Sequence, residues 1–353
     1  MPAVFSIYNC GTSHNRQNLD ETVADMARRT AGAENRDWMI NDGPGSSPQG
    51  VGKSATAFER GLAAQAKTPG TRDPITGLKQ GSFFEATRGV ISGEGWEHNV
   101  AHTMAVLNAT LDLPRTINMV GWSRGAITCF MIAHALHNNP RTSGVEVNVF
   151  AFDPVPGPGN FHDPDKVTLP ANVKHYAAVV QEDERRKIFR PTLIDADHTL
   201  GAKTRFYYMP GGHSTGVFRT KNEVGLIAAF LAHHFLQKHG TQLNQPIWLT
   251  SRDLCELYAK VRIDLAQYQG SGGGFLQILG REHRVVPNRF QDTGYFINDH
   301  HASQFRKTFP GIWSALDRGV NVSEQPAFRN ELKMLQTSAP TTYSSLQKTG
   351  IIS

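Results

Sequence analysis

The chain has few cysteines and no long run of apolar residues. Its 353 residues include three cysteines, Cys10, Cys129 and Cys255. An odd and scattered set of this kind argues against a disulfide framework and against a clustered thiolate metal site. No stretch approaches the roughly 18 consecutive apolar residues that a membrane span requires. The first residues carry neither a basic segment nor a long apolar segment, so we expect synthesis in the cytoplasm without a signal peptide.

Charge of one sign is not concentrated in any segment. The chain has 36 Lys and Arg against 31 Asp and Glu, a formal net charge of +5. The basic residues are dispersed without an aromatic-interleaved block, and the small positive charge suits an anionic lipid as well as a nucleic acid, so charge decides neither. We expect no nucleic-acid partner. The composition, 39% hydrophobic and 19% charged, is typical of a soluble globular protein. This length can bury the core of one large α/β domain with an appendage, or of two modest domains.

The most informative stretch is Gly-Trp-Ser-Arg-Gly at residues 121–125. An apolar run precedes it and apolar residues at helical spacing follow it. This is the pattern of a nucleophile elbow, in which a strand ends at a serine on a strained turn and a helix begins directly behind it. Ser123 is the predicted nucleophile, and the amides of Arg124 and of Gly11 or Thr12 are predicted oxyanion donors. The alternative interpretation is a glycine-rich turn with a solvated serine.

Apolar runs that alternate with helical periodicity predict an α/β fold, namely an α/β-hydrolase-like, mostly parallel sheet with helices on both faces. The expected strands are residues 4–8, 38–40, 117–120, 145–152, 174–180 and 204–209, and the expected helices around them are residues 20–30, 96–111 and 223–238. Beyond residue 240 the strand pattern weakens, and helices are expected near residues 254–265 and 305–316. We therefore predict a catalytic domain over residues 1–240 and a mainly helical appendage or cap over residues 241–353.

Two residues beyond Ser123 complete a candidate site. Ligands of parallel sheets bind beyond the carboxyl ends of the strands, and Asp153 and His213 each follow directly after a predicted strand. With Ser123 they reproduce the chain order Ser, Asp, His of α/β-hydrolases. Asp183 follows the strand between them and is the alternative acid, although the arginines beside it are natural ion-pair partners.

Two other motifs point to different chemistry. His98 and His102 lie four residues apart on a predicted helix, but the zinc-protease motif His-Glu-x-x-His needs Glu where this chain has Asn99. A pair of partly exposed helix histidines is the preferred interpretation. Residues 46–54 end in Gly-Lys-Ser like a P-loop, but Ser47 stands where the leading glycine is required. We expect no bound nucleotide, no metal and no cofactor.

Five stretches, in this order, resemble the catalytic domain of the type VI secretion lipase effectors, in particular the class with phospholipase A activity. They are the first strand with Gly11-Thr12, the approach over residues 93–107, Gly-Trp-Ser-Arg-Gly-Ala at residues 121–126, Asp153 together with Asp-Glu-Arg-Arg at residues 183–186, and Pro-Gly-Gly-His-Ser at residues 210–214. The resemblance spans roughly residues 5–238. It departs from the family pattern at Cys10, where the family usually has aspartate, and at Thr215, where it usually has an acidic residue.

The resemblance implies an esterase of the phospholipase A type that acts on lipid or phospholipid at a membrane surface. It also implies export by a type VI secretion machine and a cognate immunity protein. The predicted chemistry is acyl transfer to Ser123, with His213 as the base and Asp153 orienting the imidazole. The rival hypothesis from another class is a non-catalytic lipid- or protein-binding module on a hydrolase scaffold, because a fold does not by itself imply a function.

Overall fold

The computed structural model describes residues 3–44, 46, 95–194, 203–268, 294–322 and 326–352. Its chain divides into two compact units, each assembled from three segments. The first unit comprises Met1–Ala178, Ile188–Arg205 and Ala232–Pro246, and the second comprises Val179–Lys187, Phe206–Leu231 and Ile247–Ser353. Neither unit is a continuous stretch of sequence.

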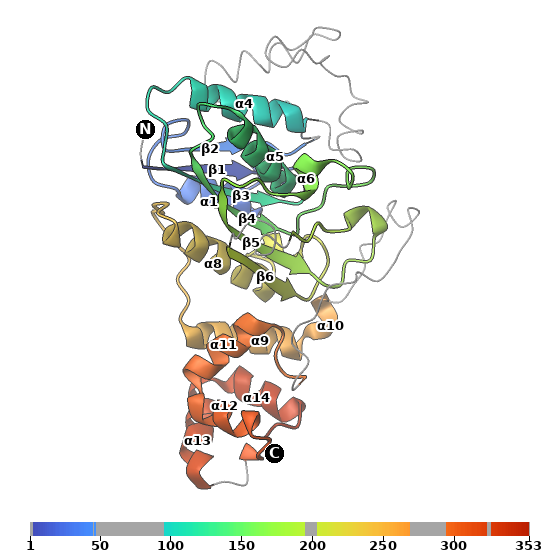
Figure 1. Ribbon diagram of the computed structural model, residues 1–353. Helices are drawn as coiled ribbons and strands as arrows, with labels where there is room; N and C mark the ends of the chain where they lie inside the picture. Colours follow the sequence, from blue (N-terminus) through green and yellow to red (C-terminus); the bar gives the residue numbers. More distant parts are fainter. Residues whose placement is uncertain are drawn as a thin grey trace. The chain divides into compact units, whose positions relative to one another are not determined.

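A parallel sheet has six strands in the order β2-β1-β3-β4-β5-β6 (Figure 1). The strands are β1 Val4–Asn9, β2 Trp38–Asn41, β3 Thr116–Trp122, β4 Glu146–Phe152, β5 Val173–Gln181 and β6 Lys203–Met209. Strands of parallel sheets are apolar along most of their length because helices cover both faces. Ile117, Met119 and Val120 of β3 accordingly have no exposed surface.

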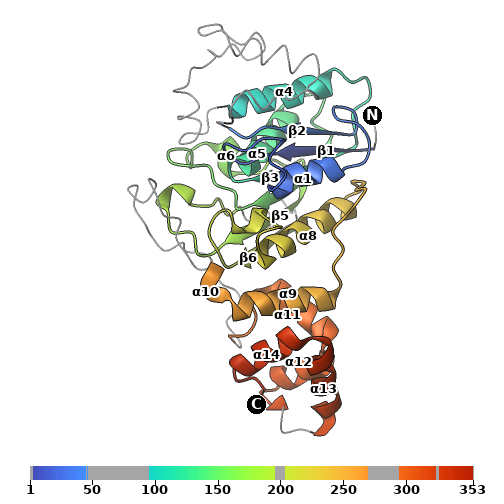
Figure 2. The same cartoon turned by 180° about the vertical axis from the view of Figure 1, so that it is seen from behind.

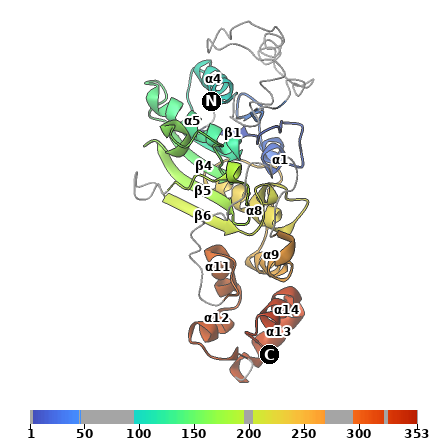
Figure 3. The same ribbon diagram turned by 90° about the vertical axis from the view of Figure 1, so that its right-hand side faces the viewer.

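Helices lie on both faces of the sheet, as the views from behind and from the side show (Figures 2 and 3). On one face lie α4 (Trp96–Asn108) and α5 (Arg124–Asn138), and on the other lies α1 (Thr22–Arg29). The last two turns of α8 (Glu223–Lys238) also pack on the sheet, where the rings of Phe235 and Phe150 are 5.6 Å apart. This arrangement confirms the α/β class predicted from the sequence.

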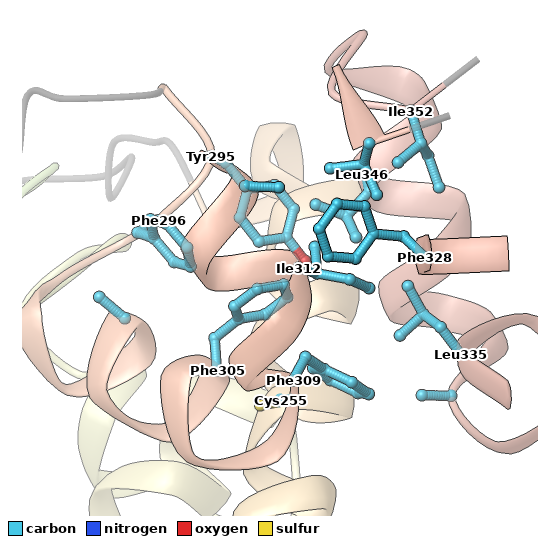
Figure 4. Close-up of a cluster of buried hydrophobic side chains, with 14 residues drawn as sticks. Cys255, Tyr295, Phe296, Phe305, Phe309, Ile312, Phe328, Leu335, Leu346 and Ile352 are labelled. Atoms are coloured by element: carbon cyan, nitrogen blue, oxygen red, sulfur yellow. The ribbon is translucent and has the colours of Figure 1, made fainter. Parts of the chain in front are cut away.

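The described residues beyond 246 are mainly helical and have a hydrophobic core of their own (Figure 4). Cys255, Phe305, Ile312, Leu335 and Leu346 come from five different helices and are all fully buried in it. The remaining helices are α6 Pro164–Val167, α9 Ser251–Ile263, α10 Leu265–Tyr268, α11 Asp299–Thr308, α12 Pro310–Asp317, α13 Arg329–Ser338 and α14 Pro340–Lys348, with the short 3-10 helices η2 Lys187–Phe189, η3 Thr215–Val217 and η6 Pro326–Phe328.

Two expected helices differ from the prediction. The helix expected over residues 96–111 stops at Asn108, where the amide and hydroxyl of Thr110 both donate to the carbonyl of Leu107; Leu111 is 98% exposed. The helix expected over residues 305–316 is two helices, because Pro310 opens α12. A proline lacks the N–H that would continue α11, but it is tolerated in the first turn of a new helix.

Across the described parts of the chain, every helix is too short or too polar to span a lipid bilayer.

Candidate active site

Ser123 occupies a sharp turn between β3 and α5. It is the N-cap residue of α5, with φ 57° and ψ −124°. A residue with a β-carbon pays about 1–3 kcal/mol for such a conformation, so the surrounding structure must hold it there. The flanking glycines make the turn sterically feasible: a β-carbon on Gly121 would lie 2.4 Å from the carbonyl oxygen of Gly125, and one on Gly125 would lie 2.2 Å from that of Asn9. The strand, strained serine and helix predicted from the sequence are therefore present.

Backbone hydrogen bonds join Ser123 to the chain before and after Asp153. The Ser123 amide donates to the carbonyl oxygen of Phe152 (2.9 Å), and the Val155 amide donates to that of Ser123 (3.4 Å). This follows from the register, since Trp122 of β3 is paired with Phe152 of β4. Asp153 also has a positive φ, 40°, and its exposed fraction is 1%. The carboxyl group therefore starts from a backbone fixed directly beside the serine.

The side chain of Arg124 extends from the start of α5 to the loop after β1. It is 2% exposed, and its Nη1 donates to Oγ1 of Thr12 (3.0 Å). The indole Nε1 of Trp96 donates to the Arg124 carbonyl oxygen (3.0 Å) and so ties α4 to the same turn. Burial lowers the pKa of Arg124 to about 10, which leaves the guanidinium charged at neutral pH. A buried cation is thus held beside the Thr12 loop.

The amide of Gly11 is engaged by a buried acid. It donates to Oε1 of Glu21 (2.9 Å), a side chain with no exposed surface. Burial raises the pKa of Glu21 to about 8; the bond from Gly11 opposes the shift, and the charge of Asp42 adds to it. Glu21 is therefore predominantly protonated at neutral pH. A β-carbon on Gly11 would lie 2.1 Å from the Trp122 ring, so the loop passes close above the end of β3.

His213 lies on the loop after β6 and is 5% exposed. Gly211, two residues before it, has φ 117°, a conformation that favours glycine. The acidic segment after β5 bonds this loop: Oδ2 of Asp183 accepts from the Gly211 amide (2.7 Å), and Oε2 of Glu184 accepts from the His213 amide (3.0 Å). Arg186 pairs with Glu184 at 2.6 Å. The histidine backbone is therefore fixed by carboxylates.

The predicted site residues divide between the two units. Ser123, Arg124, Asp153, Gly11 and Thr12 belong to the first unit, and His213 and Asp183 belong to the second. Within the first unit, Ser123 is hydrogen-bonded to the backbone on both sides of Asp153, and the Arg124 side chain donates to Thr12. Within the second, the loop of His213 is hydrogen-bonded to Asp183 and Glu184.

The alternative motifs gain no support from the described residues. No group of three or more His, Cys, Asp or Glu is placed there to hold a metal ion. Nδ1 of His102 lies 3.2 Å from Oδ1 of Asn41, a hydrogen-bond distance. The Gly-Lys-Ser segment at residues 52–54 lies outside the described residues.

Sequence reasoning does not find Glu184 or Glu21. The mixed charges of residues 182–187 favour a solvated, ion-paired loop, and only the resemblance of Asp-Glu-Arg-Arg to a family motif marks the segment. Glu21 has no signal of its own, because an acid in the first turn of a predicted helix is typical of an ordinary helix start.

Comparison with known proteins gives distant structural likeness and no sequence match. No family model matches the chain, and neither does any curated protein. An uncharacterized protein from Pseudomonas aeruginosa has a TM-score of 0.45 at 14% identity, with 98% of this chain and 60% of that chain covered. The Tle1 effector bound to the VgrG spike from the type 6 secretion system has a TM-score of 0.26 at 16% identity, with 60% and 50% covered. This chain therefore spans about half to three fifths of the length of these two proteins.

Proposed function

We propose that this protein is a serine hydrolase that cleaves carboxylic esters through an acyl-enzyme at Ser123. The observation that carries the proposal is the backbone of Ser123, strained at φ 57° and ψ −124° at the start of α5 and hydrogen-bonded to Phe152 and Val155 around Asp153. Strain of this kind persists where it serves a function, and a serine presented on such a turn is typical of α/β-hydrolases. A solvated serine in a glycine-rich turn does not require a strained backbone conformation.

In the proposed reaction, Oγ of Ser123 attacks the ester carbonyl carbon while Nε2 of His213 accepts the hydroxyl proton. The carbonyl oxygen becomes an oxyanion. When it re-forms the carbonyl, the bond to the leaving alcohol breaks, and His213 returns the proton to that alcohol. Water then repeats the sequence on the acyl-enzyme and releases the acid. Asp153 accepts a hydrogen bond from Nδ1 of His213 and offsets the imidazolium charge.

We assign the oxyanion to the backbone amides of Arg124 and Thr12. The first is the amide directly after the nucleophile, at the positive end of α5. The second amide comes from the loop after β1. There the Gly11 amide already donates to Glu21, and the Arg124 side chain bonds the hydroxyl of Thr12. Removing one such donor typically costs ~3 kcal/mol of transition-state stabilisation.

Asp153 is the preferred triad acid over Asp183. Asp153 is buried and follows β4, the neighbour of the nucleophile strand, whereas Oδ2 of Asp183 accepts from the Gly211 amide. Asp153→Asn is expected to lower kcat by roughly 10⁴-fold, the cost of holding the wrong imidazole tautomer. Asp183→Asn, compared in the same esterase assay, is expected to lose far less. The reverse order would transfer the role to Asp183.

The substrate class rests on the resemblance to phospholipase A-type effectors. We propose lipid esters as substrates, with a secretion-machine component and an immunity protein as partners. Phosphatidylethanolamine and phosphatidylglycerol liposomes, with product analysis, test the cleaved bond. Free fatty acid and lysophospholipid support the assignment; diacylglycerol, which means loss of the headgroup, contradicts it.

Labelling with a fluorophosphonate probe tests the nucleophile directly, because this reagent modifies activated serines. Mass spectrometry of the labelled protein is expected to place the adduct on Ser123. Ser123→Ala should abolish both labelling and ester turnover while the chain stays folded, and Ser143→Ala, at an exposed serine, should behave as the wild type. Absence of labelling in the wild type, or full turnover in Ser123→Ala, would favour a non-catalytic binding module.

A further inference from the structure

We propose that Glu184 is a positioning residue that, together with Arg186, fixes His213 for proton transfer. The proposal rests on the proposed serine hydrolase function, since it gives Glu184 a role only if His213 is the base. Glu184 is argued to act through the histidine and not on the substrate.

Both carboxylate oxygens of Glu184 are fully occupied. Oε1 accepts from the amide and Nε of Arg186 (2.9 and 2.7 Å), and Oε2 accepts from Nη2 of Arg186 (2.6 Å) and the amide of His213 (3.0 Å). The two oxygens therefore face the guanidinium in a side-on, two-pronged contact. The side chain of Glu184 is 1% exposed and that of Arg186 is 17% exposed.

The charge state of Glu184 fits this role. Burial alone raises the pKa of a carboxyl, but the hydrogen bonds from Arg186 and from the His213 amide outweigh it and lower the pKa of Glu184 to about 2. The carboxylate is therefore ionised throughout the pH range in which a histidine base works. A buried anion is costly unless it is paired and hydrogen-bonded. If only solubility or charge mattered, an ion pair on the surface would serve equally well without the cost of burial.

The neighbouring residues hold the same loop but not the histidine itself. The Glu182 amide donates to the carbonyl oxygen of Met209 (2.9 Å). The Asp183 amide donates to the carbonyl oxygen of Gly211 (3.0 Å), and the Gly211 amide donates to Oδ2 of Asp183 (2.7 Å). These contacts extend the pairing of the strand ends into the loop. The Glu184 carboxylate is the next contact along, and it bonds the amide of His213.

A histidine that follows two consecutive glycines needs such a contact. Glycine permits many backbone conformations, so residues 211 and 212 do not fix the position of the next residue. A displacement of about 1 Å at a catalytic group can cost roughly 10²-fold in rate. The ion pair removes this freedom at the residue where it matters.

The test compares Glu184→Gln with Glu182→Gln, a control that makes the same chemical change two residues away, where the backbone amide bonds Met209 and not His213. Burial raises the pKa of Glu182 to about 7, so the assays are run well above pH 7, where both variants lose a negative charge. Glu184→Gln is expected to lower kcat by about 10- to 100-fold, a part of the roughly 10²- to 10⁴-fold that general base catalysis supplies, with KM changed less than about twofold. The rate of fluorophosphonate labelling at Ser123 should fall in parallel. Hydrogen exchange, read by mass spectrometry on a peptide that covers residues 210–215, should become faster. Glu182→Gln should match the wild type in all four measurements.

Kinetic and exchange values equal to those of Glu182→Gln would overturn the proposal, and so would faster exchange with unchanged kcat and labelling. Should Glu184→Gln fail to fold, Glu184→Asp keeps the charge but is one methylene too short to reach Arg186 and His213 together; wild-type kcat in that variant would also overturn it. A wild-type protein that neither hydrolyses esters nor labels at Ser123 would instead refute the proposed function, while the exchange comparison would still test the contact.

Discussion

Among the described residues, Ser123 and Asp153 are two of the four non-glycine residues with positive φ, at 57° and 40°. The other two are Ser13 and Asn35, and asparagine tolerates this region well. Strain at the ends of two adjacent strands thus falls on the two residues that the sequence singles out as nucleophile and acid, which supports their proposed roles. It is maintained by close backbone contacts that only glycine permits.

Gly121→Ala tests that steric requirement. The new β-carbon would lie 2.4 Å from the carbonyl oxygen of Gly125, so the turn must shift. Overpacking of this kind is expected to lower the free energy of unfolding by about 1–3 kcal/mol, and ester turnover should fall with it. Gly144→Ala is the control, because its β-carbon would meet nothing within 4 Å and the expected change is within ~0.5 kcal/mol. Equal urea midpoints for the two variants would contradict the steric argument.

Glu21→Gln tests the buried carboxyl under the Gly11 loop. Its pKa is raised from 4.5 to about 8, so its contribution to stability is full below pH 4.5 and is lost as the pH rises through about 8. The glutamine still accepts from the Gly11 amide but does not titrate. We expect the variant to melt at the wild-type temperature near pH 4.5 and at least about 3 °C above it at pH 9, by thermal shift. A constant difference at both pH values would mean that Glu21 does not titrate as inferred.

At the residue scale the sequence predicts what a local pattern encodes. Gly-Trp-Ser-Arg-Gly identifies the strained serine, because the glycines and the apolar flanks are consecutive in the chain. It does not predict that the Arg124 side chain reaches Thr12, 112 positions away in the sequence, or that Glu184 bonds the His213 amide. These contacts depend on which loops follow neighbouring strands, and that is a property of the folded sheet.

At the element scale, a row of buried polar side chains crosses the sheet. Ser6, Asn118 and Asn148 are paired in register on β1, β3 and β4. Asn148 donates to Asn118 (2.9 Å), and Thr241, after α8, bonds both Ser6 (2.8 Å) and Asn118 (2.9 Å). A slip of one strand by one residue would leave these polar groups buried and unpaired, so the row specifies the register.

Thr250→Val tests the capping box of α9. The Thr250 hydroxyl accepts from the Asp253 amide (3.2 Å), and the Asp253 carboxylate accepts from the Thr250 amide (2.7 Å). Loss of a threonine cap typically costs about 1 kcal/mol, which we expect in chemical denaturation followed by circular dichroism. Thr337→Val makes the same chemical change at an exposed residue within α13, and should cost less than ~0.5 kcal/mol. If both changes cost the same, the cap contributes nothing.

Element boundaries show where sequence patterns reach their limit. The helix of residues 223–238 and the strand ends were predictable, because apolar periodicity and glycine-rich loops bound them clearly. The periodicity of residues 305–316 continues across Pro310, so the pattern alone predicts one helix where the backbone forms two. At Leu111 the apolar spacing continues although the helix has ended at Asn108, and that side chain is 98% exposed.

At the scale of the whole molecule, buried or half-buried histidines in both units favour the neutral form. Burial, together with His175 and Lys238, lowers the pKa of His239 in the first unit to about 4. In the second unit, burial, with His300 and Arg262 nearby, lowers the pKa of His301 well below its ordinary value. Both groups contribute stability that is full above pH 6.5 and is lost as the pH falls.

We therefore expect these two histidines to lower the melting temperature between pH 6.5 and pH 4, against the opposite contribution of Glu21. His239→Gln should reduce this fall, because one of the imidazoles that must take up a proton is removed. His137→Gln, at an exposed histidine, should keep the wild-type pH dependence. The check is a series of melting curves in buffers of equal ionic strength. A fall as steep in His239→Gln as in the wild type would show that His239 does not contribute to acid sensitivity.

The hydroxyl of Thr241, which bonds Ser6 of β1 and Asn118 of β3, has a consequence for how the protein is made. The first unit is closed by Ala232–Pro246, so a ribosome must release the chain through Thr241 before the row from Ser6 to Asn148 acquires its last member. Until then a nascent chain exposes an unfinished sheet. Truncated variants that stop at residue 240 should be prone to aggregate, whereas those that extend past residue 246 retain that closing segment.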